Sequence, residues 1–318
     1  MKESILPRMQ TNTHDTALSS IITHLHNRKM VIVLGEPGEG KTITLLDFCT
    51  QNNVPSYYFR CSPNTKMDSL LVFMAKAIGI RVVADNDQLQ AKIQDHLQKN
   101  PKYCFAFDEA EYLISGNCKK LDVLRQIFDD TDVSMVICGT YELKDVITGE
   151  NKRGKRKNHN RSQLYRRLRK VEFEMIDEQE IYDYLHLLEK EYAVIFHPQV
   201  KSRLVTHCRD RLDGGLGNFI EIIELLFSKV RPEWEAISYQ IIRDTGRILQ
   251  THAEYIQSFT GIKPEKHIVD ETTGEVQSES SGYVQELPEY DYVDVSKLEP
   301  VTIDNAIYND SLRHKMIK

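Results

Sequence analysis

The stretch VIVLGEPGEGKTITLLDF, residues 31–48, decides the fold of this chain. It places apolar residues directly before a glycine-rich turn, and an apolar helical segment directly after a Lys-Thr pair. The turn fits G-x-x-x-x-G-K-[ST], in which glycines let backbone N–H groups face a phosphate. Because the motif lies between an apolar strand and an apolar helix, its required context is present. The sequence therefore predicts a nucleoside triphosphate site here and not an ordinary turn.

Each part of the turn has an expected role. Lys41 should reach the β- and γ-phosphates, and the Thr42 hydroxyl should coordinate Mg²⁺. The helix that follows should point its positive N-terminal end at the phosphates. The residues expected to bind the nucleotide are Gly35, Glu36, Pro37, Gly38, Glu39, Gly40, Lys41 and Thr42.

Composition predicts a water-soluble intracellular protein. The 318 residues suffice for one large domain or two modest ones. A run of about 18 apolar residues, as a membrane span needs, is absent from the sequence. The N-terminus lacks the apolar core of a signal peptide, and the six cysteines include no C-x-x-C pair. We therefore expect a cytoplasmic protein with reduced thiols and no membrane association.

Hydrophobic patterning divides the chain into three parts. Up to residue 175, almost continuously apolar strands (30–34, 56–61, from 103, and 133–140) alternate with helices, which predicts an α/β domain with a parallel sheet covered on both faces. Residues 176–260 read as helices, and we expect a small all-α lid domain. Residues 262–318 hold 12 acidic and 6 basic residues, which accounts for the net charge of −6. We expect a mostly disordered acidic tail over 261–318.

A second motif, Phe105 to Glu109, ends a buried strand. It resembles a Walker B element, in which Asp108 holds Mg²⁺ through its water shell and Glu109 orients the attacking water. The alternative is an acidic cap at the carboxyl edge of the sheet. The upstream phosphate loop favours the functional interpretation. A protein that only binds nucleotide needs no second carboxylate, so Glu109 indicates hydrolysis.

Thr140 follows another apolar strand, which we expect beside the Walker B strand. This is where a residue that senses the γ-phosphate belongs. A simple Gly-Thr turn that ends the strand fits the sequence equally well.

A strongly basic stretch follows, because ten of the nineteen residues from Lys152 to Lys170 are Lys or Arg. Its first part is either a flexible loop that contacts a phosphate backbone or a solvated surface loop. Its second part should form a short helix that leads into a strand at Val171–Phe173. One arginine there could complete the site of a neighbouring subunit as an arginine finger, with Arg166 the first choice and Arg167 or Arg169 the alternatives.

These motifs in this order resemble an AAA+ ATPase over roughly residues 15–255. Within that group, DEAEYL, ICGTYELKDVI and the QLYRRL helix resemble the DNA-transposition regulators of the MuB/TnsC/TniB group. The resemblance implies an ATP- and Mg²⁺-dependent homo-oligomer, a filament or ring on duplex DNA, which presents target DNA to a transposase and disassembles on hydrolysis. It makes Arg60 and Lys66 candidate contacts to DNA phosphates. The basic stretch adds the candidates Lys152, Arg153, Lys155 and Arg156. For Lys66 a solvated helix N-terminus is an equal alternative.

The chain departs from that family in several places. Asn218 stands where many AAA+ proteins have an arginine that senses the nucleotide; it can hydrogen-bond but supplies no charge. The N-terminal helix-turn-helix domain of MuB is missing, and the insertion Lys152–His159 is unusually basic. Because acidic residues repel phosphate, we expect the tail to dock a protein partner. The alternatives are an initiator or helicase-loader ATPase, or a signalling or defence ATPase that binds a protein.

Overall fold

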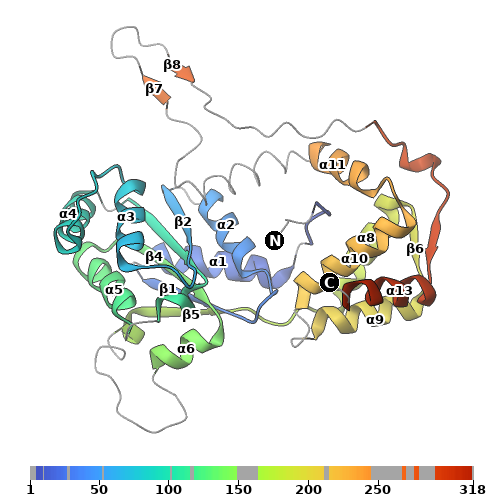
Figure 1. Cartoon of the computed structure of the whole chain (residues 1–318), viewed down its shortest axis with the longest axis horizontal. Coiled ribbons are helices and arrows are strands. Elements are labelled where there is room, and N and C mark those ends of the chain that lie inside the picture. Colours follow the sequence, from blue (N-terminus) through green and yellow to red (C-terminus); the bar gives the residue numbers. More distant parts are fainter. Residues whose placement is uncertain are drawn as a thin grey trace.

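The computed structural model describes residues 5–9, 11–26, 29–51, 54–100, 102–114, 118–148, 164–210, 215–244, 267–269, 276–278 and 291–316. One part of the molecule is built around a sheet and the other is built of helices; they lie side by side (Figure 1). The described helices include none that is long and apolar enough to cross a membrane.

Within the described residues, the main sheet has five parallel strands in the order β2-β3-β4-β1-β5. Its strands are β1 (Met30–Leu34), β2 (Ser56–Arg60), β3 (Cys104–Asp108), β4 (Ser134–Gly139) and β5 (Leu168–Glu172). Every residue of β1 and β3 is buried. A strand that is covered on both faces needs apolar residues without alternation, which is the pattern read from the sequence.

Helices cover both faces of the sheet. They are α1 (Asn12–His26), α2 (Lys41–Gln51), α3 (Met67–Ala77), α4 (Asn86–Lys99), η1 (Ala110–Leu113), α5 (Lys119–Thr131) and α6 (Tyr141–Thr148). Successive side chains of a strand point to opposite faces. Accordingly Val31 and Val33 pack with α1 and α2, whereas Ile32 and Leu34 pack with the core under α3 to α6. The predicted fold class, a parallel sheet covered by helices, is confirmed.

The strand at the sheet edge begins earlier than predicted. We expected it at Val171–Phe173, but β5 starts at Leu168, which pairs with Met30. Residues 164–167 form the helical turn before it. Leu168 and Val171 are buried while their neighbours on β5 are exposed, so pairing with β1 overrides the helical spacing of Leu164 and Leu168. Arg169 therefore lies on a strand and not on a helix.

The helical part has its own core. Its elements are α8 (Glu178–Tyr192), β6 (Val194–Phe196), α9 (Pro198–Arg209), α10 (Gly215–Val230) and α11 (Trp234–Asp244). Asp177 caps α8 in a capping box with Glu180, which satisfies backbone N–H groups at the start of the helix. Large buried side chains such as Tyr192, Phe219 and Phe227 fill the core.

Residues 291–316 differ from the expected disordered tail. They contain η2 (Val295–Lys297), β9 (Val301–Ile303) and α13 (Asn305–Met316). Strand β9 pairs in parallel with β6, and Tyr308 of α13 is fully buried in the core of the helical part. The expectation of disorder is thus wrong for this segment. Its few apolar residues are spaced so that they complete the core of the helical part. A short antiparallel pair, β7 (His267–Val269) and β8 (Val276–Ser278), is also described.

The N-terminal segment connects the two parts. Leu6 and Met9 are buried in the core of the helical part, and Tyr184 of α8 donates a hydrogen bond to the Pro7 carbonyl at 2.7 Å. Arg8 binds Asp47 of α2 at 2.6 Å. This segment therefore ties the helical part to the helix that follows the glycine-rich turn.

Candidate functional site

The glycine-rich turn joins β1 to α2 at the carboxyl edge of the sheet. Gly38 and Gly40 have φ angles of 82° and 92°, a region that side-chain-bearing residues rarely adopt. At Gly35 a Cβ atom would lie 2.9 Å from the Cβ of Phe173. These glycines let the backbone curl over the start of α2, whose N-terminal end is suited to an anion. The loop therefore has the shape that phosphate binding requires.

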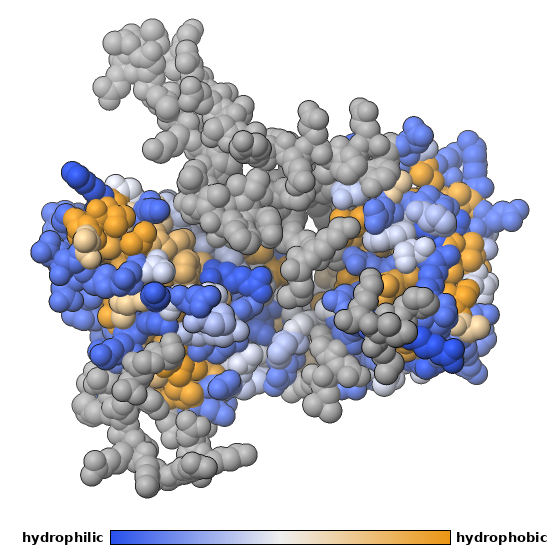
Figure 2. Space-filling model, viewed as in Figure 1, coloured by the Kyte–Doolittle hydropathy of each residue, from blue (hydrophilic) through white to orange (hydrophobic). Residues whose placement is uncertain are grey.

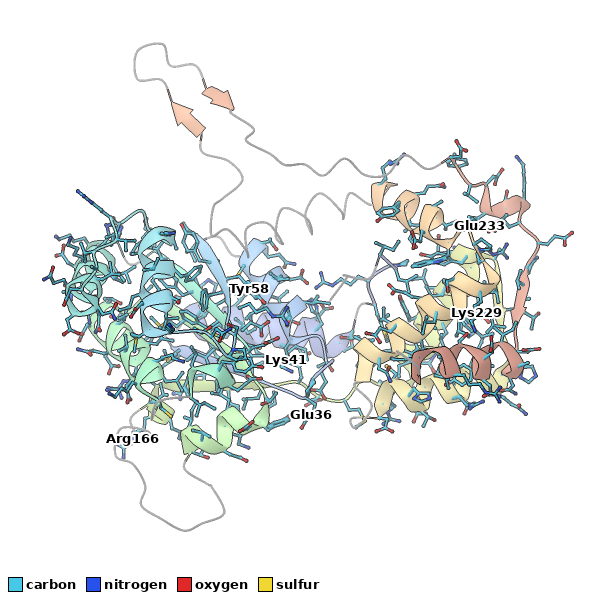
Figure 3. All side chains as sticks on the ribbon, in the orientation of Figure 1. Glu36, Lys41, Tyr58, Arg166, Lys229 and Glu233 are labelled. Atoms are coloured by element: carbon cyan, nitrogen blue, oxygen red, sulfur yellow. The ribbon has the colours of Figure 1, made fainter. Side chains whose placement is uncertain are left out.

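Lys41 and the two glutamates of the turn lie within it. The Lys41 Nζ atom donates to the Glu36 carbonyl at 2.6 Å, so the ammonium group is folded back over the loop. Glu39 Oε2 accepts from the Glu36 N–H at 2.7 Å and closes the turn. Figure 3 shows Lys41 and Glu36 on the side of the sheet part that faces the helical part.

Asp108 at the end of β3 lies directly beside the loop. Its Oδ2 atom accepts from the Thr42 hydroxyl at 2.7 Å, which brings together the two oxygen ligands predicted for Mg²⁺. Magnesium prefers one or two protein oxygens together with phosphate oxygens and waters. The residues present therefore fit Mg²⁺ bound with a nucleotide.

Tyr58 of β2 completes the surroundings of Asp108, and the sequence did not point to it. Its hydroxyl donates to Asp108 Oδ2 at 2.8 Å. Burial and the neighbouring Asp108 charge raise the pKa of Tyr58 far above its ordinary value, so it remains a donor. In the sequence, Tyr58 is indistinguishable from an aromatic core residue, because it lies in an apolar strand. The pairing of β2 with β3 brings it next to Asp108.

Glu109 is held by Arg60. The Glu109 backbone is left-handed, with φ 50°, and its N–H donates to Asp108 Oδ1 at 2.9 Å. Its side chain turns to β2, where Arg60 donates to Glu109 Oε1 from Nη2 at 2.5 Å and from Nε at 3.1 Å. The bond to Glu109 raises the pKa of Arg60. Arg60, predicted as a DNA contact, is therefore also the partner of the predicted water-orienting carboxylate.

Thr140 lies at the tip of β4, next to the loop, since the Gly35 N–H bonds the Gly139 carbonyl at 3.4 Å. Glu111 of η1 lies against this tip, and a Cβ atom on Gly139 would be 2.5 Å from Glu111 Oε2. Burial raises the pKa of Glu111, although backbone hydrogen bonds, one from Thr140, oppose the shift. Glu111 is thus a further acidic group of the site, which we did not predict. In the sequence, only its place two residues after Glu109, in the stretch DEAE, pointed to Glu111.

The three candidate arginines have different surroundings. Arg167 forms an ion pair with Asp129 of α5, which argues against it as a finger. Arg169 extends from β5, and its Nη1 donates to the Leu168 carbonyl at 3.5 Å. Arg166 is exposed and lines a cavity of about 250 Å³ with Lys144 and Tyr165. Figure 3 shows Arg166 well away from Lys41, so the structure does not bring the two together within one chain.

The helical part touches the loop through the start of α10. The Gly217 N–H donates to the Gly38 carbonyl at 3.3 Å, and the crevice between Pro37 and Leu216 has a volume of only about 20 Å³. Asn218, the next residue, accepts a hydrogen bond from Lys315 of α13. Asn218 thus follows a residue that contacts the loop, and its side chain is bound by Lys315. Its expected role in nucleotide binding stays a prediction.

The remaining candidate DNA contacts are only partly described. Lys66 is exposed at the N-cap of α3 and makes no side-chain capping bond. Lys152, Arg153, Lys155 and Arg156 lie outside the described residues. The face in Figure 2 is largely hydrophilic, with small apolar areas such as the one over α3 and α4.

Comparison with known proteins agrees with this geometry. Residues 23–147, less than half of the chain, match the family model for the AAA domain. This segment is similar to AAA domains. It runs from α1 through the glycine-rich turn, the Asp108–Glu109 pair and Thr140 to α6. The family match and the sheet topology both agree with the fold of an AAA domain.

The solved structures that resemble the chain include the following two. A Walker-type ATPase of Pyrococcus abyssi is 14% identical with a TM-score of 0.50, over 80% of this chain and 77% of that one. At this identity the likeness shows the fold alone. Domain III of the replication initiation protein DnaA of Thermotoga maritima is 14% identical with a TM-score of 0.46, over 74% of this chain and 94% of that one. A search of curated proteins finds no match.

Proposed function

We propose that the chain is an AAA+ ATPase that binds ATP with Mg²⁺ at the glycine-rich loop, hydrolyses it, and assembles on duplex DNA. The observation that carries the proposal is the Thr42–Asp108 hydrogen bond of 2.7 Å, with Lys41 in the same loop and Glu109 next to Asp108. Lys41 and Thr42 hold the phosphates, and Asp108 holds the metal with Thr42. Bound Mg²⁺ supplies charge neutralisation at the phosphates.

Two contacts of the chain must change before hydrolysis. Lys41 leaves the Glu36 carbonyl to bind phosphate, and Glu109 leaves Arg60 to orient a water molecule. A DNA phosphate competes with Glu109 for Arg60, because both are anions and the Arg60 side chain is 49% exposed. DNA binding thus releases the hydrolytic carboxylate. This coupling gives Arg60 both roles, as a DNA contact and as the inhibitor of Glu109.

Arg166 is proposed to act on a neighbouring subunit. It is exposed and lies away from Lys41 of its own chain (Figure 3), so a nucleotide that it reaches belongs to another copy. Assembly into a filament or ring would place it there. Lys66 and the basic residues from Lys152 to Arg156 are proposed as additional DNA phosphate contacts.

The finer proposal is that the assembly presents target DNA to a transposase and that hydrolysis disassembles it. The resemblance of DEAEYL, ICGTYELKDVI and QLYRRL to transposition regulators supports it. We also propose the division into an α/β domain of residues 1–175 and a helical lid of residues 176–260, and a cytoplasmic location. Leu6 and Met9 at the start of the first range, and Ile303 and Tyr308 after the lid, add to the core of the helical part.

The test is steady-state ATP hydrolysis with and without non-specific duplex DNA, combined with electron microscopy of the protein on DNA. We expect DNA-stimulated hydrolysis and ATP-dependent filaments or rings. Glu109→Gln should abolish turnover and prolong the assemblies, whereas Glu142→Gln, an exposed change on α6, should behave like the wild type. Hydrolysis that is indifferent to DNA, from a monomer, would contradict the proposal.

A further inference from the structure

The cavity beside Arg166 lies between α6 and β5 and has a volume of about 250 Å³. Its apolar lining comes from four buried side chains of β1, α6 and β5, which are Ile32, Leu34, Ile147 and Leu168. The glycine-rich turn contributes no residue to it. Figure 3 shows Arg166 at the outer side of the sheet part, away from the helical part. The cavity is therefore separate from the nucleotide site and lies where another molecule can approach.

The polar side of this cavity is strongly basic. Lys144, Arg166, Arg169 and Lys170 line it, and no acidic residue does. Lys170 and Lys144 share the carboxylate of Glu172, at 2.8 and 3.9 Å. The two arginines form no ion pair with a described acid, and the sequence has no acid from Lys152 to Lys170. The described residues of the chain thus leave part of this positive charge unneutralised.

The size and lining of the cavity favour a peptide over a nucleic acid. Sites that enclose a drug-sized ligand measure about 300–1,000 Å³, so this cavity has room for a large side chain and not for a whole nucleotide. A backbone phosphate would bind the cations but leave the apolar lining uncovered. Strand β5 is the last of the sheet, and no described strand pairs with its outer edge. Such edges accept extended segments.

The chain itself contains a segment with the matching chemistry. Residues 279–290, ESSGYVQELPEY, hold three glutamates and no Lys, Arg or His, and Leu287 lies between Glu286 and Glu289. These residues are outside the described part of the structure. The segment that follows them, from residue 291, joins the helical part beside α11, on the opposite side of the molecule from α6 (Figure 1). This placement favours a segment from a second copy over the chain's own.

We propose that the cavity between α6 and β5 binds residues 279–290 of a second copy of this chain. Leu287 fills the cavity, and Glu286 and Glu289 pair with the cations around it. The contact joins two different surfaces, so it repeats head to tail and links copies into a row or a ring. It requires neither nucleotide nor DNA and thus goes beyond the proposed function.

The first experiment measures binding of a fluorescent peptide of residues 279–290 by anisotropy, without nucleotide. The receptor is the full chain with its own residues 279–290 replaced by a Gly-Ser linker. Arg169→Glu should weaken binding about tenfold or more, because like charges then meet. Thr148→Trp, which fills the cavity from α6, and Leu287→Ser in the peptide should each weaken it about tenfold. Arg81→Glu, a reversal at another exposed arginine, should leave the affinity unchanged.

The second experiment tests the second copy by analytical ultracentrifugation, again without nucleotide or DNA. The linker variant keeps the cavity and lacks the segment, whereas Arg169→Glu keeps the segment and has an impaired cavity. Each variant alone should be a monomer, and their mixture should form a dimer that grows no further. Arg166 stays unchanged throughout, so its proposed action on a nucleotide is not disturbed.

The outcomes decide the inference in either direction. Peptide binding that none of the changes affects, or a mixture that stays monomeric, overturns it. A peptide that does not bind, with duplex DNA binding lost in Arg169→Glu, assigns the cavity to DNA and also overturns it. If Thr148→Trp fails to fold, Arg169→Glu and the altered peptide still decide. The proposed function stands apart, because ATP hydrolysis by the linker variant tests it separately.

Discussion

Arg60, at the end of β2, holds the carboxylate of Glu109, at the end of β3, with two hydrogen bonds of 2.5 and 3.1 Å to the same oxygen. The two strands pair in parallel, so the ends of both reach the same edge of the sheet as the glycine-rich loop. Glu109 in this position points to β2 and is unavailable to a water molecule at the loop. The pair is therefore expected to restrain hydrolysis.

Removing the restraint should raise the basal rate. In Arg60→Ala we expect ATP hydrolysis without DNA to increase about two- to fivefold, because a partly exposed ion pair contributes up to about 1 kcal/mol. Stimulation by duplex DNA should disappear. Steady-state rates at several DNA concentrations measure both effects.

The matched control for that variant is Arg81→Ala, which removes an exposed arginine of the same part of the molecule. It should leave the basal rate and the stimulation unchanged. A slower Arg60→Ala enzyme that DNA still stimulates would show that Arg60 does not restrain Glu109.

Tyr58→Phe should weaken magnesium binding. Its hydroxyl orients Asp108, and loss of such an outer hydrogen bond typically lowers metal affinity about 10- to 100-fold. We expect the Mg²⁺ concentration for half-maximal hydrolysis to rise by about tenfold. Tyr57→Phe, on the same strand but facing the other side of the sheet, is the control. Equal magnesium dependence of the two variants would remove Tyr58 from this role.

The Arg8–Asp47–His14 cluster should make stability depend on pH. The hydrogen bond to Asp47 raises the pKa of His14. Burial by itself would raise the pKa of Asp47, but hydrogen bonds from His14 and Arg8 outweigh it and lower that pKa. The His14 contribution is full below about pH 6.5 and is lost as pH rises through its raised value. The Asp47 contribution is full above about pH 4 and is lost as pH falls through its lowered value.

Urea unfolding of His14→Ala at several pH values tests this expectation. Near pH 5.5 the variant should lose about 1–2 kcal/mol of unfolding free energy, and the difference should shrink above neutral pH. His26→Ala, an exposed histidine of the same helix, should show no such trend. A His14→Ala deficit that grows with pH would refute the assigned direction.

The C-terminal segment should stabilise the helical part. Tyr308→Ala removes a fully buried ring and should lower the unfolding free energy by about 3–5 kcal/mol. Tyr308→Phe should cost far less, because the Tyr308 hydroxyl is buried without a hydrogen-bond partner among the described residues. Thermal unfolding compares the two.

Replacing residues 279–290 with a Gly-Ser linker tests partner docking by the acidic segment without removing α13.

Much of the site could be predicted from the chain. Gly35 to Thr42, Asp108, Glu109 and Thr140 are adjacent to apolar strands in the sequence, and the carboxyl ends of parallel strands meet at one edge. The structure brings the loop, Asp108 and the tip of β4 together in this way. Tyr58 and Glu111 were missed, because an aromatic residue in a strand and an acid after a motif carry no separate signal.

Within the expected tail, residues 291–316 are the clearest failure of local reasoning. A low density of apolar residues suggested disorder, but Ile303 and Tyr308 fill a cavity in a distant core. The partners Lys315–Asn218 and Arg203–Tyr308 are about a hundred residues apart in sequence, so neither contact is readable from a window along the chain.

The sequence by itself determined the glycine-rich loop, the order of strands and helices along the chain, and which residues are the catalytic candidates. These features depend on residues close in the chain, where periodicity and turn chemistry act. Only the tertiary structure decided that Arg60 binds Glu109, that Tyr58 hydrogen-bonds Asp108, and that Lys315 binds Asn218. Each of these pairs joins separate elements, and strand pairing and helix packing alone set which side chains meet.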